Sequence, residues 1–195
     1  MAELENMRIG CAMTGSFCTF SRVFDAWRVL KEEGAVLTPI MSENAYSIDN
    51  RFFSAFESRE IFRGICQNDI IHTIAAAEPI GPRRLLDALV IAPCTGNTLA
   101  KLAWGIADTA VTLAAKSHLR NERPLIIAVS TNDGLARNAK SIGALMAMRH
   151  VYFVPFAQDD PDGKPASLVA RMDCMPAAVA AALDGKQIQP LVLQN

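Results

Sequence analysis

The chain has 195 residues, of which 51% are hydrophobic and 20% are charged, and its formal net charge is −1. We expect one folded domain over residues 1–195, and the balanced charge favours neither nucleic acid nor an anionic membrane as a partner. No apolar run approaches the roughly 20 residues that cross a bilayer, and the acidic start is unlike a secretory signal, so we expect a cytoplasmic protein.

Short apolar runs alternate with helix-like segments in the first half of the chain. Residues 8–13 and 36–41 are predicted strands. Between them, apolar side chains recur at helical spacing and stop before Gly34, a residue that helix C-termini favour. A less regular region follows, with a helix predicted near residues 57–66, and a third strand over 69–74 fits the pattern.

The second half continues the same alternation. Strands are predicted over residues 88–92, 124–130 and 151–154, and helices over 97–119 with a break at Gly105, over 138–148 and over 177–183. Continuously apolar strands separated by helices are typical of a parallel sheet that is buried on both faces. We therefore predict an α/β fold, a Rossmann-like or flavodoxin-like three-layer sandwich with a mostly parallel sheet of about six strands. The polar segment Gln158–Pro165 is predicted to be a loop.

Neither the cysteines nor the histidines follow a known metal-binding pattern. The five cysteines are odd in number and widely spaced, without a CxxC pair, so a disulfide framework and a zinc site are both disfavoured. His72, His118 and His150 are isolated, which favours core or solvated side chains. We predict no metal site.

Small polar residues follow four of the predicted strands. In open α/β sheets, ligands bind beyond the carboxyl ends of the strands. A Gly-containing turn that leads into a helix can hold a phosphate on its N–H groups, although the GxGxxG and P-loop patterns are absent. Each cluster could also be a helix cap, but four nearly uncharged clusters together favour a flat ring with one phosphate, such as FMN. The candidate cofactor-binding residues are Thr14, Gly15, Ser16, Phe17, Ser42, Thr95, Gly96, Asn97, Thr98, Thr131 and Asn132.

The segment "APCTGNTLAKLAWGIADT" resembles the "PASANT…K.ANGIADN" signature of the flavoproteins that include the cysteine decarboxylases and the flavin prenyltransferases. The resemblance implies a Rossmann-like flavoprotein that forms homo-oligomers, often trimer-based, with FMN lodged between subunits. It also implies that Gly15 and Ser16 hold the phosphate and that Asn132 lies near the substrate. Ser42, Thr95, Asn97 and Thr98 would contact the ribityl chain, the phosphate or the ring edge. The matching positions are Pro93, Thr95, Asn97, Thr98, Lys101, Gly105 and Asp108.

One branch of that family is similar to this chain from end to end, in pieces such as "TGSFCTF", "STNDGLARNAKSIGALM", "VPFAQDDPDGKPASLVARM" and "GKQIQP". This resemblance implies an oxidoreductase component that works with a second, different polypeptide, the A subunit. Together they would oxidise dihydrodipicolinate to dipicolinate in the mother cell of a sporulating bacterium. FMN is the expected cofactor, and NADP, if used, could lie on the partner polypeptide. A small dicarboxylate substrate favours cationic donors, for which Arg83, Arg84 and Arg137 are candidates.

Two other functions stay open at this point. The chain could be a non-catalytic FMN-binding or scaffolding subunit, or an enzyme like the flavin prenyltransferases or decarboxylases. The decarboxylases place a histidine shortly before the fourth strand, where this chain has none, and of their PxMNxxMW substrate clamp only Asn132 is kept. Trp104 and Thr109 stand where the family usually has asparagines. No catalytic acid or base is assigned.

Overall fold

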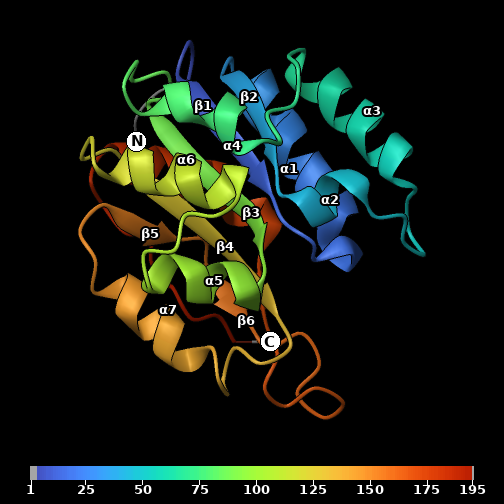
Figure 1. Cartoon of the computed structure of the whole chain (residues 1–195). Helices are drawn as coiled ribbons and strands as arrows, with labels where there is room; N and C mark the ends of the chain where they lie inside the picture. Colours follow the sequence, from blue (N-terminus) through green and yellow to red (C-terminus); the bar gives the residue numbers. More distant parts are fainter. Residues whose placement is uncertain (1–3, 195) are drawn as a thin grey trace.

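The computed structural model describes residues 4–194, which form one seven-stranded sheet with helices on both of its faces (Figure 1). Five of the strands are parallel and lie in the order β2-β1-β3-β4-β5. This is the flavodoxin-like order, in which the chain reverses direction between β1 and β3. The predicted fold class is confirmed. The bounds of these strands are Arg8–Met13 (β1), Val36–Met41 (β2), Ala88–Cys94 (β3), Leu125–Thr131 (β4) and Val151–Phe153 (β5).

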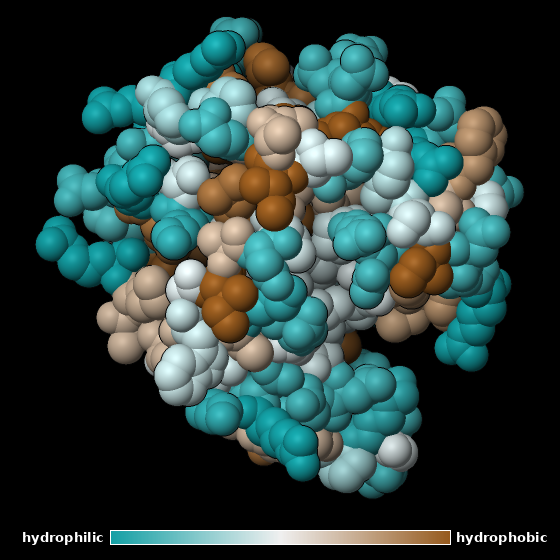
Figure 2. Space-filling view, viewed as in Figure 1, coloured by the Kyte–Doolittle hydropathy of each residue, from teal (hydrophilic) through white to brown (hydrophobic). Residues whose placement is uncertain are grey.

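Two short antiparallel strands, β6 (Phe156–Ala157) and β7 (Leu168–Ala170), extend the sheet beyond the parallel part. Strand β4 pairs with β5 along its first residues and with β7 at Ser130 and Thr131. The sequence did not predict β6 and β7, because two or three residues are too few to show a strand pattern. The predicted loop lies between them and forms the hydrophilic projection at the bottom of Figure 2.

Helices cover both faces of the sheet. In Figure 1, α5, α6 and α7 lie in front of the strands, and α1 lies behind them, where it packs against α3 and α8. The helix bounds are Phe20–Glu32 (α1), Glu43–Ser47 (α2), Ala55–Cys66 (α3), Ile74–Ala77 (α4), Gly96–Ala103 (α5), Ala110–Leu119 (α6), Ala139–Met146 (α7) and Met175–Leu183 (α8). Three 3-10 turns cover Phe17–Thr19 (η1), Glu78–Ile80 (η2) and Met172–Cys174 (η3). No helix among the described residues is long and apolar enough to cross a membrane.

The predicted long helix over residues 97–119 is interrupted, as expected, next to Gly105. This glycine has a φ of +69°, a conformation that ends α5 and that other residues adopt at a cost. The second helix, α6, starts after Thr109, whose side chain forms a capping box with Thr112. The interruption leaves residues 104–109 as a loop at the same end of the sheet as the polar clusters.

The predicted third strand over residues 69–74 was wrong. Only Ile71 pairs with a strand, through an isolated bridge to Ile40 of β2. Thr73 then caps α4, since its hydroxyl accepts a hydrogen bond from the N–H of Ala76 at 3.2 Å. A hydroxyl at a helix N-cap satisfies an N–H group that the helix leaves unpaired, and this local bond takes the chain out of the extended conformation.

Candidate functional site

The carboxyl ends of β1 and β3 are joined by the side chain of Thr14. Its hydroxyl donates to the carbonyl of Pro93 at 2.7 Å and accepts from the N–H of Thr95 at 3.0 Å. Thr14 is only 1% exposed, so its hydroxyl serves the protein itself. It sets the spacing between the turn after β1 and the turn after β3, which meet where the strand order reverses.

The turn after β3 is organised by Thr95, the N-cap of α5. Its hydroxyl lies 3.0 Å from the hydroxyl of Thr98 and accepts from the Thr98 N–H at 3.3 Å. The N–H groups of Gly96 and Asn97 belong to the first helical turn, which has no partners inside a helix. Free N–H groups and the helix dipole together favour an anion at such an end.

These residues line a pocket of about 150 Å³ at the carboxyl ends of β1, β2 and β3. The structure brings five of the predicted residues to it, namely Thr14, Ser42, Thr95, Asn97 and Thr98. Glu43, Asn44, Lys101 and Thr109 complete the lining and were not among the predicted site residues. The signal for them was present, because Glu43 and Asn44 follow Ser42 directly and the other two lie within the family motif.

Lys101 and Asp108 form an ion pair at the edge of this pocket. The Lys101 ammonium lies 2.8 Å from each carboxylate oxygen of Asp108, and its hydrogen bond lowers the pKa of that carboxyl. The pair bridges α5 and the loop before α6. That loop exposes two large apolar side chains, Trp104 at 74% and Ile106 at 47%.

The predicted turn Gly15–Phe17 adjoins the pocket but does not line it. Ser16 uses its hydroxyl in a hydrogen bond with Ser130 of β4. Within residues 4–194, the N–H of Gly15 has no hydrogen-bond partner. Phe17 turns toward the core, where its ring centroid lies 5.3 Å from that of Phe20. The turn therefore presents backbone rather than side chains.

Thr131, at the end of β4, and the residues that follow it form a second cluster next to the start of α5. The Thr131 hydroxyl donates to Asp133 at 2.6 Å, and the Asn138 amide donates to the same carboxylate oxygen at 2.5 Å. Both hydrogen bonds lower the pKa of the Asp133 carboxyl, and the bond from Thr131 has the larger effect. Asn132 is exposed. Gly96, Thr131 and Asn132 do not line the pocket, although Thr131 lies directly against Gly96 at the start of α5.

The candidate substrate-binding arginines lie at opposite ends of the parallel strands. Arg83 and Arg84 come just before the amino end of β3, which is the end away from the pocket. Arg137 follows β4 at the carboxyl edge and is close enough to Asp133 to help lower its pKa. Of the three, only Arg137 is on the side of the pocket.

Two further groups near the pocket have clear structural settings. Cys94 ends β3 and is fully buried, and burial raises its pKa, which keeps the thiol protonated at neutral pH. The His72 ring stacks on Tyr46 with centroids 3.7 Å apart. The Arg59 guanidinium lies over the same tyrosine at 4.8 Å. Tyr46 is one helical turn after Ser42, so this stack lies next to the pocket wall.

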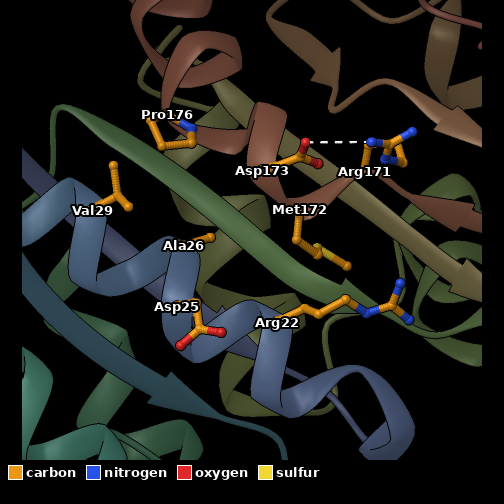
Figure 3. A pocket seen from close by; sticks show the side chains of 8 residues that line it. All are labelled: Arg22, Asp25, Ala26, Val29, Arg171, Met172, Asp173 and Pro176. Carbon is orange, nitrogen blue, oxygen red and sulfur yellow. Dashed lines mark hydrogen bonds and ion pairs between the residues drawn. The ribbon is translucent and has the colours of Figure 1, made fainter.

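A larger groove of about 490 Å³ lies elsewhere, between α1 and the η3–α8 segment (Figure 3). Its floor contains Ala26 and Met172, and its rim contains mixed charges, among them an Arg171–Asp173 ion pair at 3.5 Å. No predicted site residue lines it. We place the candidate site in the smaller pocket, because that pocket is at the strand ends and is bordered by unpaired N–H groups.

Residues 1–179 match the model of a family described as Flavoprotein. The chain belongs to the Flavoprotein family. This flavoprotein-family chain is 40% identical over its full length to the B subunit of dipicolinate synthase from Bacillus subtilis (strain 168), and the match covers 98% of that protein. The crystal structure of the corresponding B subunit from Bacillus halodurans is 39% identical, with a TM-score of 0.91 over 100% of both chains.

A solved structure with lower sequence identity shows likeness in the fold only. The FMN-dependent cysteine decarboxylase SpaF superimposes with a TM-score of 0.70 at 20% identity, over 93% of this chain and 97% of that one. The resemblance that the sequence motifs indicated, to flavoproteins and to one branch among them, is thus confirmed.

Proposed function

We propose that this chain is the B subunit of a dipicolinate synthase, an oxidoreductase component that acts with the A subunit. The pair would oxidise dihydrodipicolinate to dipicolinate in the mother cell during sporulation. The observation that carries this proposal is the 40% identity with the Bacillus subtilis protein over the whole chain. A match of this extent includes the strand-end loops as well as the core, and loops are where function is usually determined.

The donor set of the pocket fits FMN. Seven of its nine lining residues carry hydroxyl or amide side chains, and the other two are Glu43 and Lys101. Within residues 4–194, the N–H groups of Gly96 and Asn97 at the start of α5, and of Gly15 in the adjoining turn, have no hydrogen-bond partner. We assign the phosphate to the turn at Gly15 and Ser16, and the ribityl chain and ring edge to Ser42 and the turn from Thr95 to Thr98. When bound, FMN supplies a two-electron acceptor for a hydride, and the protein's part is to bind and orient the reactants.

The size of the pocket supports an assembly of several copies. At about 150 Å³ it is smaller than the roughly 300–1,000 Å³ of a typical small-molecule site. We propose that neighbouring copies in a trimer-based homo-oligomer complete the FMN site. The exposed Trp104 and Ile106 beside the pocket fit this role, since aromatic side chains are enriched in protein–protein interfaces.

The substrate side is proposed to be at the end of β4, near Asn132. Oxidation of dihydrodipicolinate removes a hydride and a proton, and both substrate and product carry two carboxylates. Of the candidate arginines, Arg137 lies at the carboxyl ends of the strands, where the pocket is. Its guanidinium can bind a carboxylate through two hydrogen bonds. We assign any NADP site to the A subunit, because this chain lacks the GxGxxG pattern.

The visible absorption spectrum of the purified chain, followed by an assay of dihydrodipicolinate oxidation with and without the A subunit, tests the proposal. We expect a flavin band after incubation with FMN, and product only when both polypeptides are present. A colourless chain that supports turnover by binding to the A subunit would have a scaffolding role instead. No product from the two polypeptides together, under either FMN or NADP supply, would overturn the proposed reaction.

A further inference from the structure

The first residue of α5 lies in direct contact with the cluster after β4. A Cβ atom built on Gly96 would overlap the amide nitrogen of Asn138 and would stand 2.7 Å from the hydroxyl of Thr131. Real Cβ atoms do not approach so closely, so this position needs glycine for the contact and not for an unusual φ angle. The backbone at Gly96 therefore packs directly against the side chains of Asn138 and Thr131.

Asp133 holds both of these side chains. One of its carboxylate oxygens accepts from the Thr131 hydroxyl at 2.6 Å and from the Asn138 amide at 2.5 Å. Its carbonyl accepts from the N–H of Asn138 at 3.2 Å, which fixes the backbone of the same turn. Asn138 is only 8% exposed, so its amide has little access to water as an alternative partner. Without the carboxylate, the amide and the hydroxyl would lose a strong common acceptor.

We propose that Asp133 is a positioning residue of the flavin site, which acts through Thr131 and Asn138 on the first turn of α5. This inference rests on the proposed FMN site in the pocket. Asp133 itself does not line that pocket. Its effect is to fix where the N–H groups of Gly96 and Asn97 and the Thr95 side chain point, and binding geometry of this kind depends on the residues that support it.

Titration of the purified full-length protein with FMN tests the proposal, with Asp133→Ala and Asp133→Asn compared with the wild type. We expect Asp133→Ala to raise the FMN Kd about tenfold, as the loss of charge-assisted hydrogen bonds predicts. Asp133→Asn keeps the shape and an acceptor oxygen but not the charge, so we expect about a fivefold increase. Asp162→Ala, a change of an exposed carboxylate in the loop after β6, is the matched control and should bind like wild type.

The binding stoichiometry and the fluorescence of bound FMN at saturation separate positioning from simple loss of folded protein. Displacement of α5 raises the FMN Kd and changes the fluorescence of the bound flavin. Partial unfolding instead lowers the stoichiometry, and the folded fraction keeps the wild-type Kd and flavin fluorescence. A Kd within twofold of wild type for Asp133→Ala overturns the inference while the FMN site stands. If Asp133→Ala does not fold, an FMN Kd within twofold of wild type for Asp133→Asn overturns the inference instead. Wild-type protein that binds no FMN overturns the FMN site and this inference together.

Discussion

The hydroxyl of Ser16 lies 2.6 Å from the hydroxyl of Ser130, and this hydrogen bond joins the turn after β1 to the end of β4. Because β3 lies between these two strands, the bond passes over its carboxyl end. Ser130 is 4% exposed and also pairs with Val169 of β7. The turn that we propose to hold the FMN phosphate is therefore tied to a buried part of the sheet.

Replacement of Ser130 by alanine should loosen this turn. We expect Ser130→Ala to lower the free energy of unfolding by about 1 kcal/mol, the usual contribution of one hydrogen bond, and to weaken FMN binding severalfold. Urea unfolding and FMN titration measure the two effects. Ser58→Ala is the control, because Ser58 is also buried and its hydroxyl donates one hydrogen bond, to the carbonyl of Ser54, the N-cap of α3. An equal loss of FMN affinity in both variants would contradict the prediction.

Thr14→Val tests the bridge between the ends of β1 and β3. Valine has the shape of threonine but can neither donate to Pro93 nor accept from Thr95. The buried carbonyl and N–H would lose a partner, so we expect a loss of about 1–3 kcal/mol in the free energy of unfolding. Thr14→Ser keeps the hydroxyl and should recover most of this loss in urea titrations. If valine is tolerated as well as serine, the bridge contributes no net stability.

Gly96 and Gly64 should respond in opposite ways to alanine. A methyl group at Gly96 meets Asn138 and Thr131, so we expect Gly96→Ala to destabilise the fold by about 1–3 kcal/mol. At Gly64, inside α3, a Cβ meets no atom within 4 Å. There, alanine should stabilise the helix by about 0.5–1 kcal/mol. Thermal unfolding of both variants measures the difference, and a stable Gly96→Ala would show that the two loops can separate freely.

His118 should make stability depend on pH between about pH 6.5 and pH 4. Burial lowers its pKa in the folded protein from 6.5 to about 4, although its Nε2–H donates to the Pro124 carbonyl at 3.0 Å. The unfolded chain therefore binds the proton more tightly than the folded protein does. The contribution, up to roughly 3 kcal/mol, is complete above pH 6.5 and is lost as the pH falls towards 4.

Urea unfolding at pH 7.5 and pH 5.0 measures this loss. The pH dependence should be smaller in His118→Gln than in wild type. His150→Asn is the control, because asparagine tolerates the φ of +64° found at this position and His150 is partly exposed. A His118→Gln protein with the full wild-type pH dependence would assign the effect to other groups.

Most elements of the fold could be predicted because they repeat a clear pattern. Strands β1 and β2 match the predicted bounds, and the glycines at positions 34 and 105 end helices as expected. Segments whose structure depends on distant partners were missed or wrong. Residues 69–74 are apolar enough for a strand, but Ile71 makes only one bridge and Thr73 starts a helix instead.

The candidate site shows the same division. The hydroxyls of Thr95 and Thr98 could be placed at a strand end from local order alone. By contrast, the roles of Thr14 and Ser16 depend on bonds to Pro93 and Ser130, which are far away in the sequence. Polar composition at the end of β4 did not reveal that Thr131 faces Asp133 instead of the pocket. Sequence order indicates which strand ends are polar, whereas three-dimensional contacts determine which hydroxyls remain free.

The change of neighbours along β4 has a consequence for solubility. A strand at the border of a sheet carries unpaired N–H and carbonyl groups, to which another chain can add by aggregation. Here β5 covers the first residues of β4 and β7 covers the last, so both ends of this long apolar strand are paired. On this side of the sheet, the border strands are β5 and β6, which are only three and two residues long. The opposite border is the six-residue β2, whose Ile40 forms an isolated bridge to Ile71. We therefore expect the C-terminal strands to protect the β4 side of the sheet against edge-to-edge association with other chains.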